Sequence, residues 1–465
     1  MVFNIILNSS NVVGSTNTAY VKSFIGGSLT IPQGSEMCIS QIVIPYSWYN
    51  ITKNYNNNSF SYIWNGYYPN VIWNGTSTSG NATLASASAD SGSSGSFGSG
   101  QLVVGSYLPA GTTYVSGTSN SITVSNNFTT SGTTVISGIP TFTGYVTMTT
   151  ISGVSTPILT LSSIVNSATF ALNTVLYSGD ANLKSNVYVK SLYSGTLGAV
   201  GSSYILANQT VNVGSVGSPF KFGFIGTYNT ITIPDGFYTV SDLNNYIQSY
   251  MISLNQYLYN STLLQNQYFA YLYSNSTYYA NQFILQGIPS SFTQYSTANP
   301  SSTYTLPTGF PFSALGYTPQ ISVVDFMSDY LGLLPAIYPS APSSSSQSVI
   351  SNYAPTGSYV NSVVVRCNLV NNNATSPTDV IDTFYPNTTF GGNIVYEPPY
   401  EKWVDIIEGT YNNLYIYFQD QDGNTIFARD NNVLISLLLK IPNYEPVVQT
   451  IQTIVQPIQP LDFKE

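Results

Sequence analysis

The sequence predicts an all-β protein, and its composition is the reason. Strand-favouring residues are abundant, with 39 Tyr and 22 Phe among many Val, Ile and Thr. The 36 Gly and 25 Pro residues supply turns between short runs of this kind. Hydrophobic residues make up 43% of the chain and charged residues only 6%, which argues against disorder over the whole chain. We therefore expect strands joined by turns, kept in solution by uncharged polar groups.

The same composition excludes several classes of chemistry. No histidine is present, so the usual triad hydrolases, zinc proteases and zinc deaminases are excluded. Cys38 and Cys367 are too few for a disulfide framework or a four-thiolate metal site. They could form one bridge, but we favour two buried free thiols. The ten Lys and Arg residues are scattered in a chain of net charge −9, without the basic patch that nucleic-acid binding needs. We expect no cofactor, no metal and no nucleic-acid partner.

Neither end of the chain predicts a targeting or membrane segment. The start, MVFNIILNSS, lacks the basic residues and long apolar run of a signal peptide. The apolar run from Val433 stops at Lys440, far short of the roughly 20 residues of a membrane helix. The proline-containing segment beyond Tyr444 is interpreted as an extended arm.

Charge distribution indicates the domain organisation. Between Asn54 and Leu183 there is no Lys or Arg, whereas Asp379–Glu465 holds twelve of the nineteen acidic residues. The charge-poor part contains a Ser/Gly-rich run and then short Val, Ile, Thr and Tyr segments separated by turn residues, typical of a small β domain. We expect this inserted domain at about residues 66–220, and a core made of residues 1–65 and 221–465.

Outside the insert, further strands are predicted. Residues 27–44 contain two β-rich runs separated by a turn at Pro32 and Gly34. Strands return after Tyr359. In residues 414–418 apolar side chains alternate with tyrosines, so we expect this strand to be covered on both faces.

One segment predicts an amphipathic helix. Apolar residues recur there at three- and four-residue steps, at Val240, Leu243, Ile247, Tyr250, Met251, Leu254 and Leu258. Thr239 or Ser241 can cap its start, and Asp242 is favourably placed in the first turn.

Two clusters suggest chemistry, but each has a simpler interpretation. Asp420, Asp422 and Asn424 resemble the first half of a calcium loop, yet Thr425 and Asn431 stand where such a loop needs Gly and Glu. A hairpin turn is the better interpretation. A second cluster suits a glycoside hydrolase, but its prolines favour a solvated loop. Its members are Glu397, Glu401, Asp405 and Glu408, around Trp403.

Asparagine sequons are plentiful, and we interpret them as chance occurrences that stay unmodified. Examples are Asn74, Asn81, Asn127, Asn208, Asn260 and Asn275.

The uncharged aromatic stretch that begins at Tyr46 is the remaining candidate. Tyr46, Trp48, Tyr49 and Trp64 are residue types enriched at interface anchors, since they bury a large area and still satisfy a polar tip. They are equally suited to the edge of the chain's own core. Both interpretations remain open from the sequence.

Several runs carry a family resemblance. ISQIVIPYSWYNITKNYNNNSFSYIW resembles a signature of minor capsid proteins of nucleo-cytoplasmic large DNA viruses and virophages, and ITIPDGFYTVSDLNNYIQSYM resembles their second signature. VVVRCNLVNN, FGGNIVYEPP and LYIYFQDQDGNTIF with NNVLISLLLKI resemble the closing strands of their penton, or vertex, proteins. The middle insert has no counterpart that we can name.

This resemblance implies a jelly roll of eight strands in two sheets, located in the virion capsid. It implies a non-enzymatic protein that forms a homopentamer at the icosahedral fivefold vertices, next to trimers of the major capsid protein. The insert would then project outward. The alternative is a non-vertex minor capsid or attachment protein whose insert binds a host-surface glycan or receptor. A major capsid protein is disfavoured, because a double jelly roll would need two similar halves.

Overall fold

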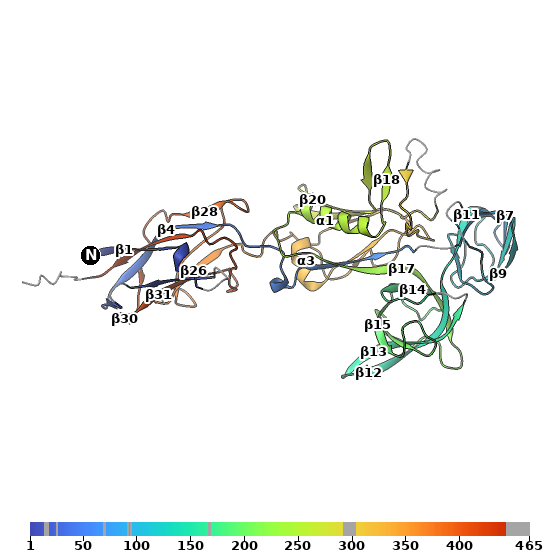
Figure 1. The fold of residues 1–465 in the computed structure, drawn as a ribbon, viewed down its shortest axis with the longest axis horizontal. Coiled ribbons are helices and arrows are strands. Elements are labelled where there is room, and N and C mark those ends of the chain that lie inside the picture. Colours follow the sequence, from blue (N-terminus) through green and yellow to red (C-terminus); the bar gives the residue numbers. More distant parts are fainter. Residues whose placement is uncertain are drawn as a thin grey trace, which may run out of the picture. The chain divides into compact units, whose positions relative to one another are not determined.

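The computed structural model describes residues 1–13, 18–24, 27–67, 71–90, 93, 95–165, 169–291 and 304–442 (Figure 1). Strands dominate these ranges, which confirms the predicted all-β class. No helix within them is long and apolar enough to cross a membrane. The predicted extended arm beyond Tyr444 lies outside the described residues. Internal contacts divide the chain into unit 1, Met1–Tyr49 with Ser358–Glu465, and unit 2, Asn50–Gly357.

Unit 1 contains two sheets whose main paths have four strands each. The first has the order β1 (Val2–Asn8), β32 (Leu434–Lys440), β4 (Glu36–Pro45) and β28 (Asn393–Tyr396), with β29 (Val404–Asp405) also paired to β4. The second has the order β2 (Ala19–Ser23), β31 (Asn413–Gln419), β26 (Val363–Cys367) and β27 (Val380–Phe384). A two-stranded ribbon joins β3 (Leu29–Ile31) to β30 (Gly409–Tyr411), and the short 3-10 helix η1 (Ser9–Asn11) follows β1.

The order of these eight main strands is that of a jelly roll. Counted along the chain, the first sheet holds strands one, eight, three and six, and the second holds two, seven, four and five. Most successive strands therefore lie in opposite sheets, and each sheet alternates strands from the two ends of the unit, as two interleaved Greek keys require. The jelly roll implied by the resemblance is confirmed, and all of it lies in unit 1.

The core of unit 1 forms because its strands alternate inward and outward side chains. In β31, Leu414, Ile416 and Phe418 are buried, whereas Tyr415 is 41% exposed. The expectation that this strand is covered on both faces is therefore wrong, because aromatic residues occupy its outer face in place of charged ones. Cys38 and Cys367 are both buried and free, as favoured from the sequence.

Unit 2 contains two larger sheets. The nine-stranded sheet has the order β12 (Thr141–Ile151), β13 (Val154–Val165), β16 (Ser203–Ala207), β15 (Tyr188–Ser194), β14 (Thr174–Ser178), β17 (Phe220–Thr232), β5 (Ser59–Trp64), β23 (Gln320–Ser322) and β24 (Ile337–Tyr338). The six-stranded sheet has the order β8 (Val103–Gly105), β11 (Gly132–Gly138), β6 (Val71–Ser77), β7 (Thr83–Ala89), β10 (Ser121–Val124) and β9 (Tyr114–Thr118).

Smaller elements complete unit 2. One three-stranded sheet joins β19 (Gln265–Gln267), β18 (Leu258–Asn260) and β22 (Tyr304–Thr305), and another joins β20 (Ala270–Asn275), β21 (Ala280–Leu285) and β25 (Gln347–Ile350). The remaining elements are η2 (Lys53–Tyr55), α1 (Val240–Ser253) and α3 (Asp325–Leu331).

The division into units differs from the boundaries expected at residues 65/66 and 220/221. Strand β17 is the reason: one part of it pairs with β14 and β12, inside residues 66–220, and its end pairs with β5, outside them. The expected insert and its flanks thus share one sheet. Whether residues 66–220 fold by themselves stays a prediction.

Helix α1 is the predicted amphipathic helix. Thr239 caps it: its hydroxyl accepts a hydrogen bond from the Asp242 amide, and the Asp242 carboxylate accepts one from the Thr239 amide. Leu243, Ile247 and Met251 are buried in the main core of unit 2, and α1 packs against β20. The start of the helix and its buried face are therefore confirmed. The expected continuation to Leu258 is wrong: the helix ends at Ser253, Asn255 turns the chain with a positive φ of 56°, and Leu258 lies in β18.

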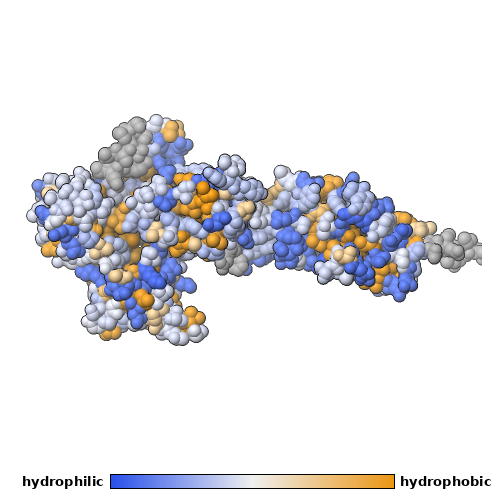
Figure 2. Space-filling model, turned by 180° about the vertical axis from the view of Figure 1, so that it is seen from behind, coloured by the Kyte–Doolittle hydropathy of each residue, from blue (hydrophilic) through white to orange (hydrophobic). Residues whose placement is uncertain are grey.

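Residues of intermediate hydropathy cover much of the surface. In Figure 2 pale residues dominate the visible face, interrupted by blue and orange patches on both units. This pattern agrees with a chain that is only 6% charged.

Candidate functional site

The predicted aromatic interface begins where β4 ends. There Tyr46 exchanges backbone hydrogen bonds with Gly391 and Gly392, which holds the chain against the loop before β28. The Tyr46 and Trp48 rings lie 4.7 Å apart between their centroids. Both side chains are buried within unit 1, so their first role is in the core of their own chain.

Tyr49 differs from these two residues because it is half-buried. The Arg429 guanidinium lies 4.4 Å from the centroid of the Tyr49 ring, within the range of a cation–π contact. The Ser47 hydroxyl accepts hydrogen bonds from the amides of Arg429 and Asp430, both 3.0 Å long. The end of β4 is thus fixed to the loop before β32.

Trp64 lies in unit 2, in β5. It is fully buried, its indole nitrogen donates to the Pro311 carbonyl at 2.9 Å, and its ring lies edge-on to Phe269 at 5.5 Å. The structure therefore does not bring the four predicted residues together, since Tyr46, Trp48 and Tyr49 belong to the other unit. Their contribution to a subunit interface stays a prediction, to which Tyr49 contributes the most accessible side chain.

Asn50 organises the start and the end of unit 2. Its side-chain amide nitrogen donates to the carbonyls of Tyr238 (2.8 Å) and Gly357 (3.0 Å), and its side-chain oxygen accepts from the Tyr238 amide (2.8 Å). Its backbone carbonyl accepts from the Asn57 side chain at 2.8 Å. Asn50 is only 1% exposed. These bonds hold the first and last residues of unit 2 side by side.

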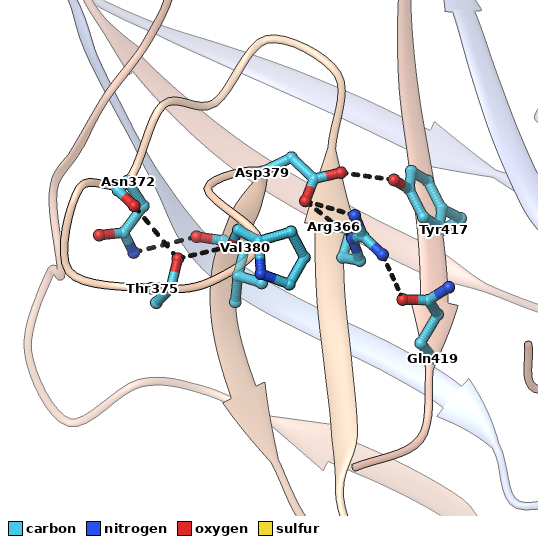
Figure 3. Close-up of polar contacts among 8 residues, drawn as sticks. Arg366, Asn372, Thr375, Asp379, Val380, Tyr417 and Gln419 are labelled. Atoms are coloured by element: carbon cyan, nitrogen blue, oxygen red, sulfur yellow. Dashed lines mark hydrogen bonds and ion pairs between the residues drawn. The ribbon is translucent and has the colours of Figure 1, made fainter. Parts of the chain in front are cut away.

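A polar cluster on the second sheet of unit 1 is shown in Figure 3. Arg366, on β26, forms an ion pair with Asp379, with nitrogen–oxygen distances of 2.6 and 2.8 Å. Arg366 also donates to the Gln419 side chain, and the Tyr417 hydroxyl donates to Asp379. The Arg366 guanidinium lies 5.1 Å from the centroid of the Tyr417 ring. The cluster therefore ties β26 to β31 and to the loop before β27.

The same loop is closed by two uncharged side chains. The Asn372 amide nitrogen donates to the Val380 carbonyl at 3.0 Å, and the Thr375 hydroxyl lies within hydrogen-bond distance of the Asn372 and Pro377 carbonyls. Figure 3 shows these contacts beside the ion pair. The loop that joins the middle strands of the jelly roll is thus held at several points.

The cluster shifts the pKa values of its members. Burial disfavours the charged form of Asp379, but hydrogen bonds from Arg366 and Tyr417, together with the Arg366 charge, outweigh it and hold the pKa of Asp379 below its usual value. Burial, with the adjacent Asp379 carboxylate, raises the pKa of Tyr417 to about 12. The shifted pKa values of Asp379 and Tyr417 therefore keep each of them in one charge state near neutral pH, as suits a structural cluster rather than proton transfer.

The calcium-like segment is a turn, as interpreted from the sequence. The Asp420 carboxylate accepts from the amides of Asp422 (2.9 Å) and Asn424 (2.8 Å) and from the Asn424 side chain (3.0 Å). Its lone pairs are thus directed at its own loop. In the described residues, no group of three or more acidic or cysteine side chains could hold a metal ion.

The acidic cluster lies in the loop and short strand after β28. Glu397 accepts a hydrogen bond from Gln41 at 2.6 Å, and Glu401 accepts one from the Trp403 indole nitrogen at 3.1 Å. These contacts link the loop to β4 and to its own aromatic residue. They provide no feature specific to glycosidase chemistry.

Sequence reasoning missed Asn50 and Arg366. Asn50 is one asparagine in an asparagine-rich chain, and its partners at Tyr238 and Gly357 are far away in the sequence. Arg366 carried a usable signal, because it is the only charged residue in the apolar run VVVRCNLV and a charge there needs a partner. The identity of that partner, Asp379, depends on how the strands pair.

Comparisons with known proteins give two matches of interest. No protein-family model matches the chain, and no curated protein matches it. Among solved structures it is similar to the mavirus penton protein, with a TM-score of 0.24 and 10% identity over 46% of this chain and 75% of that one. It is also similar to a chain of the cryo-EM structure of the Sputnik virophage, with a TM-score of 0.26 and 12% identity over 95% and 97%. Because these superpositions are loose, the strand order described above carries the fold assignment. Of these two similar structures, one is a penton protein and the other is part of a virophage particle.

Proposed function

We propose that this chain is a structural virion protein, a penton protein that forms a homopentameric capsomer at the fivefold vertices of an icosahedral capsid. The observation that carries the proposal is the complete jelly roll of unit 1. The runs that resemble the closing strands of penton proteins supply β26, β28, β31 and β32, and the run that resembles the first minor-capsid signature overlaps β4. In this proposal no residue is catalytic, and the neighbours in the shell are trimers of the major capsid protein.

The composition supports burial against neighbouring subunits. Ring closure needs two different surfaces of each subunit to meet around a rotation axis. An unpaired charge buried in such a contact is costly, and interface cores are correspondingly depleted of charge. A chain with 6% charged and 14% aromatic residues offers large areas that meet this condition.

The connection at Asn50 supports a division of labour between the units. Residue 50 and residue 357 are hydrogen-bonded neighbours, so the whole of unit 2 is inserted at one place, between β4 and β26. We propose that unit 1 builds the capsomer, whereas residues 66–220 within unit 2 face outward and are available for contact with a host-surface receptor.

Native mass spectrometry of the purified chain tests the proposal. The expected result is a species of five times the 50.3 kDa chain mass. Cryo-EM of virions should then place the chain at the fivefold vertices. A different closed number, or density at another shell position, would contradict the vertex assignment and favour a non-vertex minor capsid protein.

A further inference from the structure

Unit 2 contains a pocket of about 480 Å³ that none of the features above explains. It is lined by the segment before α1, the β20–β21 hairpin, α3 and the last residues of unit 2. The lining residues that matter here are Tyr238, Ser274, Asn275, Tyr279, Asn281 and Tyr330. The volume is within the range of pockets for small molecules.

The inner wall of the pocket is fixed by hydrogen bonds. The Tyr330 hydroxyl donates to the Tyr238 carbonyl at 2.7 Å, and the Asn281 side chain donates to the Tyr330 carbonyl at 3.2 Å. Asn281 and Tyr330 are both buried. The pocket is therefore formed before any ligand arrives, which lowers the entropic cost of binding.

Among the described residues, none that lines this pocket carries a charged side chain. The polar groups that line it are hydroxyls and side-chain amides, such as those of Ser274 and Asn275, and the rest are apolar or aromatic surfaces. A charged ligand would lose hydration here without gaining an ionic partner, which is costly. A neutral ligand with both an apolar face and hydrogen-bonding groups fits this lining.

Tyr279, at the rim, has an unusual backbone. Its φ is 49°, in the left-handed region, and its side chain is 77% exposed. A residue with a Cβ is strained in this conformation, and glycine avoids that strain. What sets Tyr279 apart is its place at the rim of the pocket, where its exposed ring is available to a ligand.

The neighbouring hairpin provides an internal comparison. Asn260–Gln265 reads NSTLLQ and Asn275–Ala280 reads NSTYYA, and in both the last residue of the turn has a positive φ. In the first hairpin this residue is Leu264, with φ 53° and 75% exposure. Leu264 does not line the pocket, so it shares the strain of Tyr279 without its location.

We propose that this pocket binds a neutral saccharide. The ring of Tyr279 packs against the apolar face of a sugar. The Ser274 hydroxyl and the side-chain oxygen of Asn275, whose amide nitrogen donates to Gln282 at 2.7 Å, hydrogen-bond to the sugar hydroxyls. The pocket lies outside residues 66–220, so this site is distinct from the receptor contact proposed for that segment. The inference also stands independently of pentamer formation.

A panel of soluble oligosaccharides tests the proposal on the full chain. The panel contains neutral glycans ending in galactose, glucose, mannose or N-acetylglucosamine, together with their sialylated and sulfated counterparts. Saturation-transfer NMR first identifies a ligand, and calorimetric titration then measures its affinity. We expect binding of at least one neutral glycan, weakened at least tenfold by Tyr279→Ala and by Tyr279→Gly.

Leu264→Gly is the matched control. Both glycine variants relieve the same backbone strain, so each should unfold at the same temperature as the parent chain or a higher one. Only Tyr279→Gly should lose glycan binding. This combination separates loss of the side chain from loss of the fold.

Three results would overturn the proposal. They are binding of acidic glycans only, no binding of any neutral glycan at millimolar concentration, and unchanged affinity in Tyr279→Gly. The mass of the assembled protein is a separate measurement, so failure here and failure of the penton proposal are distinguishable.

Discussion

Replacing Asn50 by Ala should destabilise unit 2 strongly. The side chain is buried and makes three hydrogen bonds, two to the carbonyls of Tyr238 and Gly357 and one from the Tyr238 amide. A neutral hydrogen bond contributes about 0.5–1.5 kcal/mol to stability, and a partner left unpaired adds to the loss. We therefore expect the free energy of unfolding of unit 2 to fall by about 2–4 kcal/mol.

Asn50→Asp separates hydrogen bonding from packing. Aspartate has nearly the same shape, but its carboxylate can only accept, so it keeps the bond from the Tyr238 amide and loses both bonds to carbonyls. It also places a negative charge against those carbonyl oxygens. We expect Asn50→Asp to be at least as destabilised as Asn50→Ala.

Urea denaturation of the full chain measures both variants. Hydrogen exchange at the amides of β17 and α1 assigns the transition to unit 2. Asn120→Ala is the control, because this asparagine is exposed and its replacement should change stability by less than about 0.5 kcal/mol. If Asn50→Ala changes stability no more than the control, or if Asn50→Asp is tolerated, the role assigned to these bonds is refuted.

Three further predictions concern other parts of the chain. Thr239→Ala should lower the free energy of unfolding, measured by urea denaturation, by about 1 kcal/mol. The hydrogen bonds of the cap lower the pKa of Asp242. The stabilisation that they add should therefore be present above pH about 4 and be lost as the pH falls through that lowered pKa. Arg366→Ala should destabilise unit 1 by about 2–3 kcal/mol, since it leaves the Asp379 carboxylate unpaired. In the parent chain the contribution of that ion pair should likewise be lost on acidification below pH about 4, because the pKa of Asp379 is lowered; an Arg366→Ala chain with an unchanged acid-unfolding curve would contradict this. Replacing residues 50–357 by a short Gly-Ser linker should leave a protein whose circular dichroism spectrum is that of a folded β protein. The first and last residues of the deleted segment are neighbours, and all eight strands of the jelly roll remain. An unfolded product would contradict the independence of unit 1.

Local features of this protein were predictable because their physical causes are local. The helix that begins at Val240 follows from the spacing of its apolar residues and from the capping residues Thr239 and Asp242, which lie only three positions apart. The turn at Asp420 follows in the same way from neighbouring side chains. Composition likewise determined the all-β class and excluded histidine chemistry.

The division into units could not be predicted from composition. The charge-poor segment suggested a boundary near residue 66, but β5 pairs with β17 across that segment, and this pairing makes the flanks part of the same sheet. Strand pairing over such a distance depends on which apolar faces cover one another in the folded chain, and residue counts within a window carry no information on it.

The sequence by itself determined the fold class, one capped helix, and a composition with few charges and many aromatic side chains. Only the tertiary structure decided their roles. It buried Trp48 and Trp64 in separate units, paired Arg366 with Asp379, and placed Tyr279 at the rim of an uncharged pocket. The physical reason is that burial and pairing are properties of contacts between distant segments, and such contacts exist only once the chain has folded.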